Sequence, residues 1–357
     1  MTFPNSRHAH VIGLGLIGAS VGLALRSVGW TVTGTDVDRD VVRAALEAEV
    51  IEGEEPDAEL RLVVVATPAG AVSAIVRAVL DAYPRPDLLV TDVAGVKGSI
   101  AREIGDPRFL AGHPMAGSEQ RGLHGARADL FSGCTWVLTP TAATLPAAYG
   151  ELHGILREIG ANVVAVSADD HDRLVALASH VPHLVAGALM NEAAQAAEED
   201  AVLLQLAAGG FRDMTRVAAG DPSIWPDVLF ENRVAVSQTL RSLEERLAAL
   251  RAALDTGGRD VVEQSLRTAS IARRQLPGRA LSAENLAYLR VSVSDQPGVL
   301  ATVTMAASEL LVNIYDIEIA HGIEGVGGTL LLAIDATQSD VFTAALVARG
   351  FSVSSER

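Results

Sequence analysis

The sequence is poor in cysteine, in aromatic residues and in positive charge. Its 357 residues include one cysteine, Cys134, which excludes an internal disulfide and any metal site built from several cysteines. Aromatic residues supply 4% of the chain, so Ala, Val and Leu must fill its core. Lys and Arg number 28 against 44 Asp and Glu, a formal net charge of −16, which argues against a nucleic-acid or anionic-membrane surface.

No segment has the pattern of a signal peptide or a membrane span. The first ten residues, MTFPNSRHAH, lack an apolar core. The most apolar stretch, residues 174–190, carries His180, Pro182 and His183 in its middle, so we expect a buried helix there. Hydrophobic residues make up 49% of the chain, which excludes wholesale disorder. We therefore expect a soluble, cytoplasmic protein of more than one domain.

Residues 1–167 alternate between short apolar runs and helical patterns. The runs HVIGLG, TVTGTD, RLVVVAT, LLVTD and FLAGHP have strand length, and segments with helix-like spacing lie between them. Strand–helix alternation predicts an α/β Rossmann-type domain, a doubly wound parallel sheet with helices on both faces.

Two further domains are expected. Residues 168–278 show helical periodicity with Ala and Leu throughout, which predicts an all-α helical substrate and dimerisation domain. Some of its faces are too apolar to be solvated, so we expect a subunit interface as well as a core. After the linker QLPGRALSAEN, the order strand, helix, strand, strand, helix, strand over residues 286–357 predicts a small α+β ferredoxin-like domain.

The motif GLGLIG follows the strand AHVI and opens a helix. In that setting Gly13 permits the tight turn, Gly15 lets the backbone approach a pyrophosphate, and Gly18 allows close helix–strand packing. Asp36 ends the second strand, where an acid can bind the adenosine ribose diol and repel a 2′-phosphate. We therefore expect NAD rather than NADP, although Arg39 nearby leaves NADP open.

Two segments follow the fourth and fifth strands, at the edge of the sheet where ligands collect. They are DVAGVKG and GHPMAGSE. His113 in the second segment can face the nicotinamide, and a neutral imidazole is a suitable base for an alcohol proton lost alongside hydride. The alternative is a histidine that only caps a strand end. Lys97 in the first segment we expect at the surface, at a helix N-terminus.

The segment SHVPH has a spacing that could chelate a metal ion. Pro182 disturbs the helix, cysteine is absent and no carboxylate is suitably spaced, so we expect no metal. His180 and His183 are expected to line a polar pocket at the domain junction. The equal alternative is that both are core histidines bonded to backbone carbonyls.

The segment GGFRDMTR interrupts the helical region with paired glycines and two arginines. Because a planar guanidinium binds a carboxylate bidentately, Arg216 or Arg212 is a candidate substrate clamp. A surface ion pair is the alternative. Trp225, one of three tryptophans, is by itself explained as a packing anchor at a helix start.

In this order, GLGLIGAS, Asp36, DVAGVKG, GHPMAGSE, SHVPHLVA and GGFRDMTRVAAGDPSIW resemble the prephenate/arogenate dehydrogenase family, over residues 8–275. The tail, with DQPGVL and Asn313-Ile314, is similar to an ACT domain, the amino-acid-sensing module that some members carry.

The resemblance implies an NAD-dependent oxidative decarboxylation of prephenate to 4-hydroxyphenylpyruvate in tyrosine biosynthesis. Arogenate, which gives tyrosine directly, is the alternative substrate. His113 would accept the proton of the ring hydroxyl, and Arg216 would hold the ring carboxylate. The implied substrate-binding residues are Ser179, His180, His183, Glu119, Asp213 and Trp225, the tryptophan reaching in from the partner subunit of a homodimer. The implied cofactor-binding residues are Gly13, Gly15, Leu16, Ile17, Gly18, Asp36, Thr67, Asp92 and Gly95.

One position departs from the family. Members commonly have serine where this chain has Gly95, and that serine orients the catalytic histidine and touches the cofactor. Its absence puts the orientation of His113 in doubt, and a water or Ser118 would have to take its place.

In the tail, DQPG would present free N–H groups at a helix start to the carboxylate of an amino acid. The expected regulatory residues are Asp295, Pro297, Gly298, Asn313 and Ile314. Feedback by tyrosine is the hypothesis, and an interface module without a ligand is its alternative.

Two other functions are alternatives to this one. A β-hydroxyacid dehydrogenase would use a catalytic lysine in the helical domain, and residues 168–275 contain none. A catalytically silent regulator that senses NAD and an amino acid is supported only by Gly95, while His113 and Arg216 oppose it.

Overall fold

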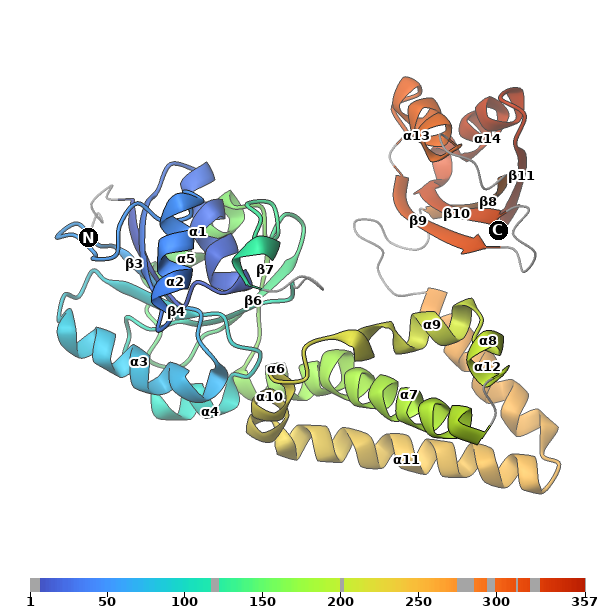
Figure 1. The fold of residues 1–357 in the computed structure, drawn as a ribbon, viewed down its shortest axis with the longest axis horizontal. Coiled ribbons are helices and arrows are strands. Elements are labelled where there is room, and N and C mark those ends of the chain that lie inside the picture. Colours follow the sequence, from blue (N-terminus) through green and yellow to red (C-terminus); the bar gives the residue numbers. More distant parts are fainter. Residues whose placement is uncertain are drawn as a thin grey trace. The chain divides into compact units, whose positions relative to one another are not determined.

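The computed structural model describes residues 7–116, 122–199, 202–274, 286–293, 299–312, 314–321 and 328–356 (Figure 1). It divides into two compact units. One comprises residues 1–198 and 215–243, and the other comprises residues 199–214 and 244–357.

The first unit begins with a parallel sheet in the order β2-β1-β3-β4. Its strands are β1 (His8–Ile12), β2 (Thr31–Thr35), β3 (Leu62–Val65) and β4 (Leu89–Asp92). Helices cover both of its faces (Figure 1). They are α1 (Leu16–Ser27), α2 (Arg39–Glu47) and α5 (Pro146–Glu158) on one face, and α3 (Ala69–Ala82) and α4 (Gly98–Glu103) on the other.

Strand β3 shows why its sequence has no polar alternation. Leu62 and Val64 enter the core beneath α1 and α2, while Val63 and Val65 enter the core beneath α3 and α4. A strand that is covered on both faces has no solvent-facing side, so an unbroken run of β-branched and aliphatic residues is favoured, here LVVV. The predicted Rossmann-type doubly wound arrangement is confirmed for this part of the chain.

The next strands add an antiparallel pair, whose direction the sequence did not predict. β5 (Ala111–Pro114), β6 (Thr135–Thr139) and β7 (Asn162–Ala165) form a second sheet in which β5 and β6 are antiparallel. The described residues between β5 and β6 contain only the one-turn helix η1 (Leu123–Gly125). Without a crossover helix, a chain that returns beside its own strand must run in the opposite direction.

The two sheets meet just before β5. The N–H of Leu110 donates to the carbonyl of Val90 and the N–H of Val90 donates to the carbonyl of Arg108, both at 2.9 Å. The chain leading into β5 therefore runs beside β4, and the carboxyl ends of these two strands lie at the same edge. His113 and Asp92 are brought together in this way.

A long helical segment follows, and it is interrupted where the sequence has proline. It consists of α6 (Ala168–Val175), the π-helical turn η2 (Ala176–His180) and α7 (Val181–Glu199). Pro182 has no N–H for the helical hydrogen bond and its ring crowds the preceding turn, so the helix widens before it. The segment 168–198 is long and apolar enough to cross a membrane by length and composition alone, and only 28% of its most apolar window is buried. The expected buried helix is thus buried on one face.

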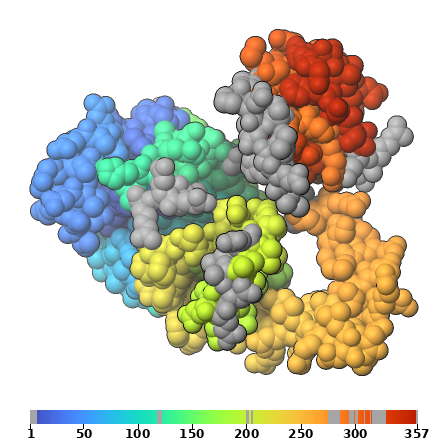
Figure 2. Space-filling model, turned by 45° about the vertical axis from the view of Figure 1, so that its right-hand side comes forward, coloured from blue at the N-terminus to red at the C-terminus, as the bar shows by residue number. Residues whose placement is uncertain are grey.

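The remaining helices are α8 (Val202–Leu206), α9 (Gly209–Thr215), the 3-10 turn η3 (Arg216–Ala219), α10 (Trp225–Glu231), α11 (Arg233–Asp255) and α12 (Arg259–Arg274). A small core of Ala176, Val181 and Val236 joins α10 and α11 to the π turn and α7. Helix α10 also packs against α3, and Figure 2 shows its yellow segment beside the cyan one. Asn232 separates α10 from α11.

The C-terminal part has the predicted order of elements. They are β8 (Leu286–Val293), α13 (Val299–Glu309), β9 (Ile314–His321), β10 (Gly328–Asp335), α14 (Ser339–Ala348) and β11 (Ser352–Glu356). The strands form an antiparallel sheet in the order β11-β8-β10-β9 around a core that includes Val291, Leu332 and Phe342. The predicted ferredoxin-like βαββαβ arrangement is confirmed. The predicted linker over residues 275–285 lies outside the described residues.

Candidate active site

The glycine loop before α1 has the backbone that phosphate binding requires. Gly13 has φ of +94°, and a Cβ placed there would lie 2.5 Å from the carbonyl oxygen of Ala66. A Cβ at Gly18 would lie 1.9 Å from the carbonyl oxygen of Gly13, so α1 approaches the loop as closely as a glycine allows. Nothing lies within 4 Å of a Cβ at Gly15, which is exposed. The loop is thus tight beneath and open above, with the N-terminus of α1 facing the open side.

Asp36 holds this loop from the end of β2. Its carboxylate accepts the N–H of Leu14 at 2.7 Å and the N–H of Asp38 at 3.0 Å. The nearby Arg39 forms an ion pair with Glu54. Arg39 is the cation that would favour a 2′-phosphate, and here it is already paired with Glu54.

The other expected cofactor residues border the loop. Leu16 and Ile17 are half-buried in the first turn of α1. The methyl group of Thr67 lies 3.3 Å from the Cβ position of Gly13. The buried Thr67 hydroxyl has no hydrogen-bond partner among the described residues. These side chains fit a nucleotide that lies across the loop.

Lys97 is buried, and its predicted surface position is wrong. It is the only lysine in the chain, its side chain is 0% exposed, and it pairs with Asp92, which is also 0% exposed. Burial lowers the pKa of Lys97, and the adjacent Asp92 carboxylate opposes that effect. The surface prediction failed because the Lys97 side chain turns back under β4 instead of following α4.

Asp92 also accepts the N–H groups of Ala94 at 3.0 Å and Gly112 at 3.2 Å. This one carboxylate therefore joins the end of β4, the turn over residues 93–97 and β5. Asp92 is 0% exposed, and its oxygens are occupied within the protein.

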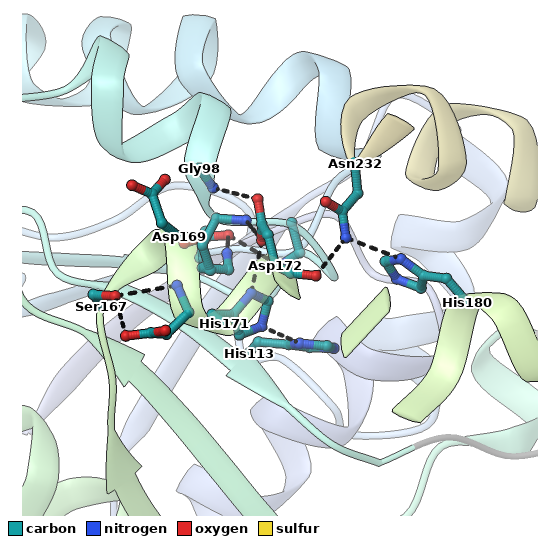
Figure 3. A network of polar contacts seen from close by, with 12 residues as sticks. Gly98, His113, Ser167, Asp169, His171, Asp172, His180 and Asn232 are labelled. Atoms are coloured by element: carbon teal, nitrogen blue, oxygen red, sulfur yellow. Dashed lines mark hydrogen bonds and ion pairs between the residues drawn. The ribbon is translucent and has the colours of Figure 1, made fainter. Parts of the chain in front are cut away.

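His113 ends a chain of hydrogen-bonded polar side chains in which His171 is buried and His113 and Asp172 are half-buried (Figure 3). Its Nδ1 lies 2.8 Å from Nε2 of His171, and Nδ1 of His171 lies 2.8 Å from the carboxylate of Asp172. Burial, followed by the positive charge of Lys97, holds the pKa of His113 well below its usual 6.5. His113 is therefore neutral at neutral pH, as a general base must be.

Local sequence explains how Asp172 reaches this position. The side chain of Ser167 accepts the N–H of Asp170 at 3.1 Å and starts α6. One turn later the Asp172 carboxylate accepts the N–H groups of Lys97 and Gly98 at 2.8 Å each, at the start of α4. Burial raises the pKa of Asp172, but the hydrogen bonds from His171 and these two N–H groups outweigh it and lower the pKa overall.

The other nitrogen of His113 faces Gly95. A Cβ at Gly95 would lie 3.8 Å from Nε2 of His113 and 3.8 Å from a methyl group of Val228 on α10. No hydrogen bond to this Nε2 is seen within the described ranges. The space beside Gly95 is therefore where a substrate hydroxyl could reach the free nitrogen of His113.

The two histidines of SHVPH have different neighbours. Nδ2 of Asn232 lies 3.2 Å from Nδ1 of His180 and donates to the carbonyl of Asp172 at 2.8 Å. Burial lowers the pKa of His180 to about 4. His183 stacks on Trp225 of the same chain, with ring centroids 3.7 Å apart, and burial lowers its pKa too. In the part of the chain that the structure describes, no three metal-ligating side chains gather.

The remaining predicted substrate residues are dispersed. Ser179 is half-buried in the π turn. Arg216 is exposed at the start of η3, and Gly220 at the end of that turn approaches His183, at 3.5 Å from its Cβ position. Asp213 is exposed on α9 and belongs to the second compact unit. Glu119 and Ser118 lie outside the described residues.

His171, Asp172 and Asn232 were not predicted from the sequence. The first two stand in ADDHD, which has the composition of an ordinary acidic first turn of a helix. Nothing local relates them to His113, which precedes His171 by 58 positions. Asn232 lies within a stretch of helical periodicity and gave no local signal.

Comparisons with known proteins agree with this architecture. Residues 21–165 match the family described as prephenate dehydrogenase, nucleotide-binding domain, and residues 167–268 match prephenate dehydrogenase, dimerization domain. The chain is 31% identical to a cyclohexadienyl dehydrogenase of Zymomonas mobilis over 282 residues, 76% of this chain and 96% of that protein. It is 29% identical to a prephenate dehydrogenase of Bacillus subtilis over 337 residues, 91% of each chain.

Among solved structures, prephenate dehydrogenase from Aquifex aeolicus, in complex with hydroxyphenyl propionate and NAD+, is similar with a TM-score of 0.71 and 25% identity. The similarity covers 77% of this chain and 99% of that one.

Proposed function

The chain belongs to the prephenate dehydrogenase family, and from this premise we propose that it catalyses the NAD-dependent oxidative decarboxylation of prephenate to 4-hydroxyphenylpyruvate. The observation that supports this most directly is His113. It is half-buried and neutral, its Nδ1 is bonded to His171, and its Nε2 faces the space beside Gly95.

The reaction needs one base that first takes a proton and then returns it. Bound NAD supplies the hydride acceptor. As hydride leaves the ring carbon, Nε2 of His113 takes the proton of the hydroxyl on that carbon, and a carbonyl forms. The bond between the ring and its carboxylate then breaks, and the electron pair moves through the ring to the oxygen. His113 returns the proton, so the products are CO2 and the phenol.

The glycine loop and Asp36 support NAD as the cofactor. The open space above Gly15 suits a pyrophosphate, and Asp36 is available to the adenosine ribose diol. Arg39, the residue that could have favoured NADP, is paired with Glu54. We propose that Leu16, Ile17, Thr67 and Gly95 complete the contact with NAD, with Asp92 acting through the turn that it anchors.

Arg216 is proposed to hold the ring carboxylate, because its turn ends beside His183. Ser179, His180, His183 and Trp225 are proposed to line the substrate pocket, with Glu119 and Asp213 shaping it. Arogenate is the second candidate substrate, and it differs from prephenate at the side chain, away from the ring hydroxyl that His113 serves.

The deciding experiment measures NADH production by the purified protein with NAD and prephenate, with arogenate run in parallel. We expect turnover with prephenate to exceed turnover with arogenate. The reverse preference would make arogenate the substrate. NAD binding with no turnover of either substrate would favour the silent regulator.

We further propose a homodimer formed by the helical segment. Several large side chains there are exposed in the single chain, among them Leu177, Phe230 and Val234. The family name of residues 167–268 supports the same assembly. The domains are then proposed to be 1–167, 168–278 and 286–357, in a protein that works in the cytoplasm.

We propose that the C-terminal βαββαβ domain is an ACT-like sensor for tyrosine. Of its expected ligand residues, Ile314 packs partly against the domain core, while Asp295, Pro297, Gly298 and Asn313 lie outside the described residues. Tyrosine is expected to inhibit turnover and raise the melting temperature. An unchanged rate and melting temperature at saturating tyrosine would leave an interface module.

A further inference from the structure

The side chains behind His113 form a chain of hydrogen bonds whose direction can be assigned. It runs from Asp172 through His171 to Nδ1 of His113, with both contacts at 2.8 Å. His171 is 1% exposed, so bulk water does not compete for either nitrogen of its ring. Figure 3 shows the two imidazoles joined by this hydrogen bond; their ring centroids are 5.1 Å apart and their planes are inclined by 68°.

The direction follows from the carboxylate at the end of the chain. Asp172 also accepts the N–H groups of Lys97 and Gly98, so its oxygens act as acceptors throughout. His171 must therefore carry a proton on Nδ1 to donate to Asp172. In a neutral His171 the Nε2 is then a lone pair, and Nδ1 of His113 must donate to it. In a neutral His113 this leaves the lone pair on Nε2, the nitrogen beside Gly95.

We propose that Asp172 and His171 are a positioning dyad that fixes the ring orientation and tautomer of His113, so that its Nε2 is the basic nitrogen. This rests on the proposed function, in which that nitrogen takes the hydroxyl proton. It also accounts for Gly95. A histidine anchored through Nδ1 needs no serine hydroxyl on its other side, so the family's usual orienting residue is dispensable in this chain.

During the reaction the proton on Nδ1 of His113 stays in place. The hydroxyl proton binds Nε2, the resulting imidazolium continues to donate from Nδ1 to His171, and Asp172 stabilises the positive charge through His171. The charged and titratable groups around His113 are Lys97 on one side and His171, His180 and Asp172 on the other. Lys97, paired with Asp92, favours the neutral base, while Asp172 favours the charged acid.

The dyad also has a defined support. Asn232 donates to the carbonyl of Asp172 and lies against His180, which ties the second turn of α6 to the start of α11. The Asp172 carboxylate ties the same turn to α4. His171 is thus fixed from two directions by residues that do not approach the reacting atoms, which is how a positioning group differs from a catalytic one.

The test compares two variants of His171 with a matched neighbour. His171→Phe keeps the ring volume and removes both nitrogens, whereas His171→Gln returns an acceptor toward His113. Arg173→Gln is the control on the same helix, because Arg173 is exposed and pairs only with Asp170 among the described residues. Each protein is assayed for kcat and KM with prephenate, for NAD affinity and for melting temperature.

We expect kcat of His171→Phe to fall about a hundredfold, the scale on which a wrongly presented general base loses its effect. NAD affinity should stay unchanged and KM for prephenate should change less than about threefold. His171→Gln should recover at least about tenfold of that loss, as one hydrogen bond allows. A purely structural His171 would instead lower the melting temperature while leaving kcat per folded molecule unchanged, and that result would overturn the proposal.

A spectroscopic readout separates this proposal from the proposed function. In the intact protein labelled with ¹⁵N-histidine, Nδ1 of His113 should give the chemical shift of a protonated nitrogen, and Nε2 that of an unprotonated one. The signal is assigned by its loss in His113→Asn. If the opposite tautomer is found, the dyad is wrong even where prephenate is turned over. If the predicted tautomer is found but neither prephenate nor arogenate reacts, the dyad stands and the proposed function fails.

Discussion

The glycine loop and the histidine chain lie in the same compact unit but are built in opposite ways. The loop works through backbone groups and missing side chains, since Gly13 and Gly18 leave no room for a Cβ and Gly15 leaves open space. The histidine chain works through side chains of β5 and α6 that meet in partly buried hydrogen bonds. The loop should therefore be sensitive to added volume, and the chain to lost nitrogen atoms and to protonation.

The largest effect that would separate the histidine chain from the loop is expected from His113→Asn. We expect turnover to fall by about a thousandfold or more, because the general base is removed. NAD affinity should be unchanged, because the loop does not depend on His113. Steady-state kinetics measure the turnover, and a fluorescence titration with NADH measures the cofactor affinity. His124→Asn, at an exposed histidine, is the control and should match the wild type.

The next largest effect is expected on stability, from Lys97→Met. This change leaves the buried Asp92 carboxylate without its partner and should cost about 3–5 kcal/mol of unfolding free energy. Urea denaturation measures it. Arg102→Met, at an exposed arginine on the same short helix, should stay within about 0.5 kcal/mol of the wild type. An equal loss in both variants would show that Lys97 does not hold a buried pair.

The loop itself can be tested with two alanines. Gly18→Ala places a Cβ where the carbonyl oxygen of Gly13 lies and should lower the unfolding free energy by about 3 kcal/mol. Gly15→Ala points into open space, so stability should be retained while NAD affinity falls. Calorimetry and NADH titration distinguish the two. Equal melting temperatures for both variants would contradict the geometry of the loop.

The histidine chain predicts a particular dependence on pH. Because burial and Lys97 hold the pKa of His113 well below 6.5, His113 remains a neutral base as the pH falls past that value. The acid limb of kcat/KM for prephenate is therefore expected below pH 6.5, with activity lost only as the pH falls through the lowered pKa. A limb centred at 6.5 or higher would mean that His113 is solvated or is not the base.

The smallest expected effect sharpens the comparison. Gly95→Ser fits the space beside His113, where the nearest atoms to a Cβ are 3.8 Å away. A second orienting hydrogen bond should raise kcat by at most about fivefold, equivalent to about 1 kcal/mol. Because the histidine chain already fixes His113, a rise of a hundredfold would show that the chain orients it poorly. Gly95→Ala separates the hydroxyl from added bulk.

The sequence predicted what is encoded locally. The apolar runs predicted the strands, the helical spacing between them predicted the helices, and the glycine loop predicted the nucleotide site. Each of these signals lies in neighbouring residues. The antiparallel pairing of β5 with β6 was missed because periodicity carries no strand direction. The sequence predicted Lys97 at the surface because charged side chains are normally solvated. Its burial depends on the ion pair with the buried Asp92, which the sequence does not show. His171 and Asp172 were missed because their partners lie in another segment.

Asp172 also bears on how such chains recombine. Its carboxylate caps α4 from across the boundary at residue 167, and a Cβ at position 98 would lie 2.7 Å from its oxygen. Consider a hybrid that joins the nucleotide-binding half of one relative to the helical half of another. We expect its histidine at position 171 to stay aligned with the one at 113 only if glycine at 98 and aspartate at 172 are both present. In this chain the two halves are therefore a matched pair rather than interchangeable modules.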